Sequence, residues 1–329
     1  MGKIRIGIIG YGNLGKGVES SVRQNEDMEL AAVFTNLDPS TISLRTPNVP
    51  VMDVKEAGAM KGKIDVMILC CGSAVDMPVQ GPVSAAAFNT VDCYDTHAKI
   101  PEYFKNMDAS SKSGGNVSVI SIGWDPGVFS LAKAYGDAFL PQGKTYTFWG
   151  KGVSQGHSEA VRRMDGVKHA VQYTVPYEKA LQSVRNGENP ELKSGDCMWR
   201  ECFVVLEEGA DAKKIERDIK TMPDYFAGYN TEVHFITEEE FKASHTAMPH
   251  GGFVLRSGVT GIEKPNRQTI EYGLKLESNP EFTASVAVAY ARAAYRLNRA
   301  GETGARTIFD IPPALLSNKT REEMIREFL

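Results

Sequence analysis

Three glycines near the amino terminus have the spacing of a phosphate-binding turn. The apolar run 4–9 leads directly into Gly10-Tyr11-Gly12-Asn13-Leu14-Gly15. In such a turn the first glycine permits the bend, the second lets the backbone approach a pyrophosphate, and the third lets the helix pack closely on the strand. The phosphates then lie at the helix N-terminus, where free N–H groups favour negative charge. The strand before this motif and the amphipathic helix after it predict a dinucleotide site.

Two aspartates each stand just after an apolar run. Asp95 follows the run 90–94, and Asp125 follows the run 116–121. An Asp-Pro pair ahead of a helix is a common helix cap, so capping and binding both stay open for Asp125. Two carboxylates in one crevice would attract an ammonium group and orient an amine for hydride removal.

The second half of the chain offers groups of the opposite polarity. Arg200, His250 and Thr174 together could hold a carboxylate through charge-assisted hydrogen bonds. His250 lies in a rigid loop that has little reason to carry an imidazole for packing, Met248-Pro249-His250-Gly251-Gly252. A ligand with both amino and carboxyl groups fits the two sets, so we expect an amino acid.

The elements that must position these residues alternate between strands and helices over the first third of the chain. Apolar runs at 29–34, 65–70, 90–94 and 116–121 alternate with helical stretches such as 100–113. Such runs are typical of a parallel sheet covered on both faces. We therefore expect an α/β fold of the Rossmann type, a doubly wound parallel sheet whose ligands bind beyond the carboxyl ends of the strands.

The pattern changes after about residue 125. Strand-like stretches now follow one another with fewer helices between them, at 144–149, 167–175, 201–206, 230–236, 252–257 and 268–276. They predict a second, α+β domain on a mostly antiparallel sheet, a common surface for pairing two subunits. A helix over 282–299 is expected to return to the first domain. The domains are thus a dinucleotide-binding domain over 1–125, with a returning segment at about 280–329, and a substrate and dimerisation domain over 126–279.

Composition excludes several classes of function. The chain has 329 residues, a net charge of −4 and 42% hydrophobic residues, without clusters of Lys and Arg. We expect neither a nucleic-acid partner nor a membrane partner, because no apolar run reaches the roughly 18 residues that span a bilayer. Five cysteines without framework spacing and the direct entry into a strand favour a cytoplasmic protein. No zinc spacing is present, so no metal is expected.

The end of the second strand sorts the cofactor in such folds. An acidic residue there binds the ribose 2′-OH of NAD, and an arginine binds the 2′-phosphate of NADP. Here the strand ends without an arginine, in Phe34-Thr35-Asn36-Leu37-Asp38. Taken alone, this loop leaves both cofactors open and tends slightly towards NAD.

Several motifs spread over the chain resemble one family of dehydrogenases. They are Gly10–Gly15, Ser121-Ile-Gly-Trp-Asp-Pro-Gly127, Thr147-Phe-Trp-Gly150, Ser154-Gln-Gly-His157, Val171-Gln-Tyr-Thr174, Thr221-Met-Pro-Asp-Tyr-Phe226 and Met248-Pro-His-Gly-Gly252. Their combination resembles meso-diaminopimelate dehydrogenase over essentially the whole chain. The resemblance implies NADP⁺-dependent oxidative deamination of the D-centre of meso-2,6-diaminopimelate to L-2-amino-6-oxopimelate and ammonia. It also implies the reverse reductive amination in lysine biosynthesis, and a homodimer formed through the second domain.

The same resemblance implies roles for individual residues. Asp95 and Asp125 would contact the amino group at the reacting centre, with Trp149, Gln155 and Gly156 holding that centre in place. Thr174, Arg200 and His250 would bind the distal carboxylate, and Asn279 would read the distal L-centre. The cofactor would lie on Gly10, Tyr11, Gly12, Asn13, Leu14, Gly15, Thr35, Asn36, Leu37, Cys70, Cys71, Gly72, Ser73, Cys93, Tyr94, Asp95, Ile122, Gly123, Trp124, Asp125 and Pro126.

The chain departs from the family pattern after the second strand. The family usually carries Arg-Arg where Asn36-Leu37 stand here, and that pair grips the 2′-phosphate. Our hypothesis is a natural or engineered variant with relaxed or NAD-shifted cofactor use, in which Arg45 from the following loop could substitute.

Two other functions stay as alternatives. One is a broader D-amino acid dehydrogenase of the same family. The other is a serine hydrolase using Ser154, since Gly152-Val-Ser-Gln-Gly156 matches the G-x-S-x-G motif. That motif places its serine at the immediate exit of a strand, whereas here Gly150-Lys-Gly152 intervenes.

Overall fold

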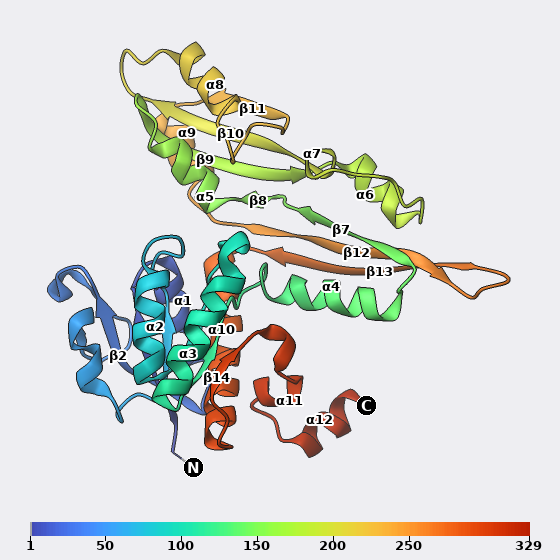
Figure 1. Cartoon of the computed structure of the whole chain (residues 1–329). Coiled ribbons are helices and arrows are strands. Elements are labelled where there is room, and N and C mark those ends of the chain that lie inside the picture. Colours follow the sequence, from blue (N-terminus) through green and yellow to red (C-terminus); the bar gives the residue numbers. More distant parts are fainter. Residues whose placement is uncertain (1) are drawn as a thin grey trace. The chain divides into compact units, whose positions relative to one another are not determined.

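The computed structural model describes residues 2–329 (Figure 1). The chain divides into two compact units, one of Met1–Leu131 with Pro280–Leu329 and the other of Ala132–Asn279. Within the described residues, no helix is both long enough and apolar enough to cross a bilayer.

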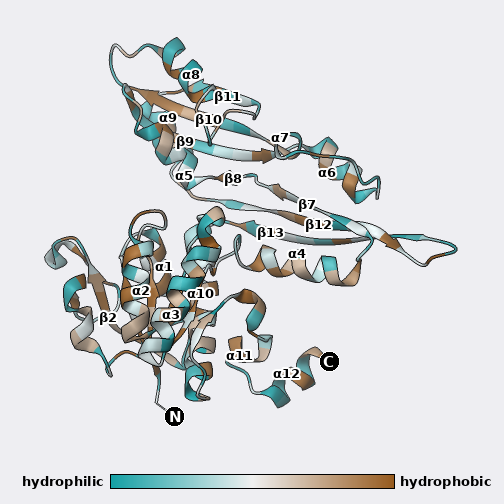
Figure 2. Cartoon of the chain, in the orientation of Figure 1, coloured by the Kyte–Doolittle hydropathy of each residue, from teal (hydrophilic) through white to brown (hydrophobic). Residues whose placement is uncertain are grey.

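The first unit is built on a seven-stranded sheet with the strand order β14-β6-β5-β4-β1-β2-β3. All of its strand pairs are parallel. Its strands are β1 (Ile4–Ile9), β2 (Met28–Thr35), β3 (Val51–Asp53), β4 (Val66–Leu69), β5 (Asn89–Asp92), β6 (Val117–Val119) and β14 (Gly304–Arg306). The central strands are buried along nearly their whole length, and β2 is mainly hydrophobic (Figure 2). The prediction of a parallel Rossmann-type sheet is confirmed.

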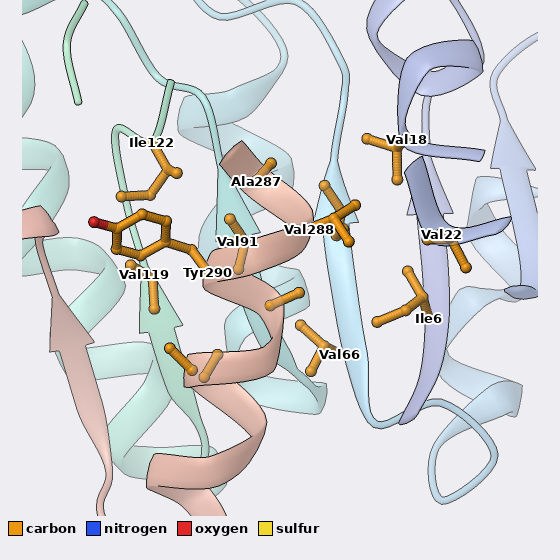
Figure 3. Packing of buried hydrophobic residues seen from close by; sticks show 14 of the residues in the cluster. Ile6, Val18, Val22, Val66, Val91, Val119, Ile122, Ala287, Val288 and Tyr290 are labelled. Carbon is orange, nitrogen blue, oxygen red and sulfur yellow. The ribbon is translucent and has the colours of Figure 1, made fainter. Parts of the chain in front are cut away.

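Helices cover both faces of this sheet. On one face, α1 (Asn13–Arg23) and α10 (Asn279–Arg299) pack on β1, β4, β5 and β6 through one apolar cluster (Figure 3). The two helices lie close together, because a Cβ on Gly17 of α1 would be 2.9 Å from Cβ of Ala284 of α10. On the other face, α2 (Met77–Ala87) and α3 (Ile100–Gly114) form a separate cluster. Small residues in α10 are therefore needed where it meets α1.

The second unit contains two sheets. One has the order β11-β10-β9-β8 and the other the order β13-β12-β7. The strands are β7 (Gly143–Trp149), β8 (Gly152–Val153), β9 (Val167–Pro176), β10 (Met198–Leu206), β11 (Thr231–Phe235), β12 (His250–Thr260) and β13 (Asn266–Leu276). All of their pairs are antiparallel except β10 with β11.

The mostly antiparallel second domain is confirmed, but its strands divide between two sheets, where the sequence predicts one. The division follows from the turn at Gly150, which has φ +110°. A Cβ there would lie 2.0 Å from the carbonyl oxygen of Thr174, so only glycine fits. The chain leaves β7 at this turn and continues in β8, which pairs with β9.

The remaining helices are short apart from one. They are α4 (Val128–Phe139), α5 (Gln155–Arg162), α6 (Glu178–Arg185), α7 (Ser194–Cys197), α8 (Ala212–Lys220), α9 (Glu238–Ser244), α11 (Pro313–Leu316) and α12 (Arg321–Phe328). Residues of α5 and α8 share an apolar cluster with β9 and β10, so these two helices cover one face of the four-stranded sheet.

Candidate active site

The glycine turn of the first unit has the geometry that its spacing predicts. Gly10 has φ +90°, and a Cβ there would lie 2.8 Å from the carbonyl oxygen of Cys70. A Cβ on Gly15 would lie 2.2 Å from the carbonyl oxygen of Gly10, so the helix approaches the turn as closely as glycine allows. Gly12, the N-cap of α1, has nothing within 4 Å of its Cβ position. This open space beside a helix N-terminus fits a pyrophosphate.

These contacts predict opposite outcomes for two alanine substitutions. Gly12→Ala should leave the melting temperature unchanged, because the methyl group meets no protein atom and φ is −80°. It should weaken NADPH binding by about tenfold or more, or about 1.4 kcal/mol, since the methyl group occupies the phosphate space.

Gly15→Ala should instead lower the free energy of unfolding by about 1–3 kcal/mol or more through overpacking. Thermal unfolding and fluorescence titration with NADPH measure the two effects. A destabilised Gly12→Ala variant, or a Gly15→Ala variant as stable as the parent, would contradict this account of the turn.

The end of β2 presents few groups that could bind a phosphate. Thr35 is buried, and its hydroxyl accepts a hydrogen bond from the N–H of Leu37 at 3.0 Å. Asn36 and Leu37 are exposed, and Asp38 caps the next turn by accepting from the N–H of Ser40. The cation that follows in the chain, Arg45, donates to the hydroxyl of Ser20 on α1 at 3.3 Å. Asn36 therefore faces solvent without an arginine beside it in the sequence.

A buried carboxylate organises the loops that follow β5 and β6. Oδ1 of Asp92 accepts hydrogen bonds from the N–H of Tyr94 at 3.0 Å and of Ser121 at 2.9 Å. Its Oδ2 accepts from the hydroxyl of Tyr103 at 2.9 Å. Burial raises the pKa of Asp92 to about 6, although these hydrogen bonds act in the opposite direction. Asp92 thus fixes the start of both loops that carry the predicted acids.

The predicted acids themselves lie near the surface of the first unit. Asp95 is exposed, and its N–H donates to the hydroxyl of Ser73 at 3.0 Å, which joins the β5 loop to the β4 loop. Asp125 is half-buried and follows the buried Trp124.

Burial raises the pKa of Cys71 to about 12 and that of Cys70 and Cys93 as well, so these thiols are not nucleophiles at neutral pH.

In the second unit, Thr174 and Arg200 are direct partners. They lie opposite each other on β9 and β10, and Nη1 of Arg200 donates to Oγ1 of Thr174 at 2.6 Å. The guanidinium carbon lies 4.2 Å from the centroid of the Tyr229 ring. Arg200 is only 7% exposed, and burial lowers its pKa. Among the salt bridges of residues 2–329, none joins Arg200 to a carboxylate.

Two further predicted residues are brought towards this pair. Gly152 of β8 pairs with Thr174, and a Cβ on Gly152 would be 2.3 Å from Cα of the buried His250. The N–H of Asn279 donates to the carbonyl oxygen of Met248 at 3.0 Å. His250 therefore lies next to β8, the strand that pairs with Thr174, and it begins β12 although the sequence predicts a loop there. Asn279 holds the segment just before it through Met248.

Trp149 ends β7 just before the turn at Gly150, and Gln155 begins α5, after β8. Trp149 pairs with Gly252, two residues after His250. Gln155 and Gly156 begin α5, are exposed, and leave the Cβ position of Gly156 open. Trp149, Gln155 and His250 thus lie near the ends of β7, β8 and β12, whereas Thr174 and Arg200 lie on β9 and β10.

Contrary to the expectation from the sequence, Ser154 directly follows a strand, because β8 ends at Val153 and Ser154 caps α5. Its contact with His157 resembles part of a hydrolase site. Oγ of Ser154 lies 2.7 Å from Nδ1 of His157. However, burial lowers the pKa of His157 to about 4, with the charge of Arg200 as the second cause. An imidazole with so low a pKa is a weak general base at neutral pH. The rings of Tyr225 and Phe226 pack edge-on to the imidazole, which is therefore held neutral in an aromatic pocket.

The lowered pKa of His157 predicts a pH dependence of stability. The pKa of an unfolded histidine is about 6.5, whereas burial lowers the pKa of folded His157 to about 4. Between pH 6.5 and 4 the unfolded state therefore binds a proton that the folded state does not bind. The contribution of His157 to the free energy of unfolding is complete above pH 6.5 and is lost as the pH falls towards 4. The loss is at most about 3 kcal/mol.

His157→Asn should flatten this dependence when melting temperatures are compared between pH 4.5 and 7.5. His97→Asn, at an exposed position, is the control and should keep the slope of the parent. An unchanged slope in His157→Asn would show that other groups cause the acid sensitivity.

Comparison with known proteins gives the same answer by every route. Residues 123–278 match the family model of the diaminopimelic acid dehydrogenase C-terminal domain. The meso-diaminopimelate D-dehydrogenase of Acetivibrio thermocellus is 61% identical over 99% of this chain and 98% of that protein. This chain belongs to the meso-diaminopimelate dehydrogenase family.

Solved structures of the family have the same fold. The diaminopimelate dehydrogenase of Corynebacterium glutamicum in complex with DAP is 45% identical, with a TM-score of 0.93 over 100% of both chains. An engineered D-amino acid dehydrogenase bound to NADP⁺ is 43% identical, with a TM-score of 0.88 over 99% of this chain and 100% of that one.

Membership of this family was readable from the motifs, but several supporting residues were not. Four residues contact predicted site residues or hold their loops, although the sequence predicts no such role for them: Asp92, His157, Gln172 and Tyr229. For Gln172 a signal existed, because it stands two positions from Thr174 on one strand and so faces the same side. Tyr229 lies in a loop before β11, and nothing in its spacing points to Arg200. Among residues 2–329, no cluster of three or more His, Cys, Asp or Glu side chains could hold a metal ion.

Proposed function

We propose that this chain catalyses the NAD(P)⁺-dependent oxidative deamination of the D-centre of meso-2,6-diaminopimelate. The products are L-2-amino-6-oxopimelate and ammonia, and the reverse reaction is a reductive amination in lysine biosynthesis. The family supports the reaction type, and its solved members include one in complex with DAP and one bound to NADP⁺.

The observation that carries this proposal is the buried Arg200 without a carboxylate partner. A buried charge is costly unless it is paired. The guanidinium of Arg200 contacts the hydroxyl oxygen of Thr174 and the ring of Tyr229, and neither group is an anion. A substrate carboxylate would supply the missing charge. Because Arg200 is buried, this site should discriminate strongly between substrates. A substrate without that carboxylate would leave the charge of Arg200 unpaired.

The remaining substrate contacts follow from charge. Asp95 and Asp125 would hold the amino group at the reacting centre, and Trp149, Gln155 and Gly156 would fix that centre in position. His250 would join Thr174 and Arg200 on the distal carboxylate, and Asn279 would contact the distal L-centre. An amine must be unprotonated to lose hydride from its carbon, and water then hydrolyses the imine. Positioning of the substrate supplies much of the rate in such chemistry.

The glycine turn fits a dinucleotide, because the Cβ position of Gly12 is open beside a helix N-terminus. When bound, NADP⁺ or NAD⁺ supplies the hydride acceptor. The loops after β1, β2, β4, β5 and β6 would hold the cofactor at the carboxyl edge of the sheet. We propose a relaxed or NAD-shifted preference, since Asn36 and Leu37 carry no charge for a 2′-phosphate.

We further propose a homodimer in the cytoplasm. Strand β13 is an edge strand of its sheet, and most of its residues are exposed. An edge of this length offers unpaired backbone groups that a second copy can cover. All five cysteines are free thiols, as a reducing compartment requires.

One assay tests the proposed reaction. Reduction of NADP⁺ and of NAD⁺ is followed separately at 340 nm with meso-diaminopimelate and then with D-alanine. We expect fast reduction with meso-diaminopimelate and a rate with D-alanine lower by about 10³-fold or more, because the distal contacts are then lost. Equal rates would favour the broader D-amino acid dehydrogenase, and no reduction with either substrate would end the proposal.

A further inference from the structure

A fully buried glutamine stands beside the proposed carboxylate-binding pair. Gln172 has no exposed surface, and its side chain lies on the same face of β9 as Thr174. Its amide Nε2 donates to Oγ1 of Thr174 at 3.3 Å, and its Oε1 has no hydrogen-bond partner within residues 2–329. Burying an amide with an unsatisfied oxygen costs free energy. If the side chain at this position served only for packing, an apolar residue would cost less free energy to bury.

The hydrogen bonds around Thr174 fix what its hydroxyl group can do. A threonine hydroxyl has two acceptor lone pairs and one donor proton. Nη1 of Arg200 at 2.6 Å and Nε2 of Gln172 at 3.3 Å occupy the two lone pairs. Both neighbours are donors, so the hydroxyl proton must point away from them. The remaining capacity of Thr174 is to donate one hydrogen bond.

We infer that Gln172 is a positioning residue that sets Thr174 as a hydrogen-bond donor to the distal carboxylate of the substrate. This inference rests on the proposed function of Thr174 and Arg200. The two groups would then present hydrogen-bond donors to one anion, Thr174 through its proton and Arg200 through its guanidinium. Without the amide of Gln172, one lone pair of Thr174 is free, and its hydroxyl proton can rotate away from the anion.

The backbone of Gln172 is fixed independently of its side chain. Its N–H donates to Oγ of Ser158 at 2.9 Å, and its carbonyl oxygen accepts from the N–H of Ser154 at 3.0 Å. On β10 it pairs with Cys202. A substitution that keeps the size of the side chain therefore leaves the strand and the start of α5 in place.

Two substitutions separate the donor role from packing. Gln172→Met keeps the volume and removes the amide, and KM for meso-diaminopimelate should rise by about 3–20-fold with kcat changed less than about twofold. Gln172→Glu keeps the shape of the side chain but replaces the donating amide by a carboxylate. The carboxylate would accept the hydrogen bond of the Thr174 hydroxyl and form an ion pair with Arg200. The KM of this variant should rise by about 100-fold or more. Gln268→Met removes a similar bond to Thr260 on β12 and is the control, with KM unchanged.

A double-mutant cycle with Thr174→Val gives the decisive readout. If Gln172 acts through Thr174, Gln172→Met should add less than about twofold to KM once Thr174→Val is present. An equal rise in both backgrounds, or a Gln172→Glu variant with the KM of the parent, would overturn the inference. If Thr174→Val alone leaves KM unchanged, the proposed carboxylate site fails as well. Melting temperatures and NADPH affinity, measured in parallel, should stay within the range of the parent.

Discussion

Replacing Arg200 by methionine is expected to lower kcat/KM for meso-diaminopimelate by about 10²–10³-fold. Removing one partner of a buried, hydrogen-bonded charge pair costs about 2–5 kcal/mol in binding. The free enzyme should keep its stability or gain some, because the substitution removes a buried charge that has no carboxylate partner. Steady-state kinetics and thermal unfolding without substrate measure the two effects separately.

A second buried arginine of the same unit provides the matched control. Arg256 is 6% exposed, but it donates to the carbonyl oxygen of Leu140 at 2.6 Å and 2.9 Å and pairs with Asp137 at 3.1 Å. Arg256→Met should therefore destabilise the protein by about 1–3 kcal/mol and leave KM of the folded enzyme unchanged. An Arg200→Met variant whose kcat/KM stays within threefold of the parent would remove the main support for the proposed function.

The second large effect concerns the cofactor. Introducing Asn36→Arg and Leu37→Arg together should raise the ratio of kcat/KM for NADP⁺ over that for NAD⁺ by about 10²–10⁴-fold. Each arginine adds a charge-assisted contact to the 2′-phosphate, worth about 1.5–3 kcal/mol. Both positions are exposed at the end of β2, so the new side chains displace no core residue.

The parent enzyme and an Arg45→Gln variant complete this experiment. Arg45 donates to Ser20 on α1, at the surface of the same unit. If it substitutes for the missing pair, Arg45→Gln should lower kcat/KM with NADP⁺ and leave the value with NAD⁺ unchanged. A strong NADP⁺ preference in the parent that survives Arg45→Gln would contradict the hypothesis of shifted cofactor use.

The sequence was sufficient wherever local rules act alone. Spacing and residue type predict the three-glycine turn and the apolar strands of the first unit. They also show that candidate groups of opposite charge, Asp95 and Arg200, stand in different halves of the chain. Gly15, for example, is required by the carbonyl oxygen of Gly10, five residues earlier, and such short-range contacts leave a readable pattern.

Long-range contacts set the limit of that reading. Asp92 is a polar residue at the end of a buried strand, and its purpose depends on the N–H of Ser121, which reaches it from the end of β6. The division of the second unit into two sheets depends on Gly150 meeting the carbonyl oxygen of Thr174 on β9. No pattern in the sequence predicts either contact, because each joins segments that only the tertiary structure brings together.

The discontinuity of the first unit has a consequence for how the chain matures on the ribosome. Residues 132–279 form an uninterrupted unit, whereas α1 and strands β1, β4, β5 and β6 pack on α10, which is synthesised after them. The later unit can therefore complete its core before α10 and the rest of residues 280–329 are available to the earlier one. A nascent chain stalled before residue 280 would expose the apolar face that α10 covers, and exposed apolar surface of this kind favours aggregation.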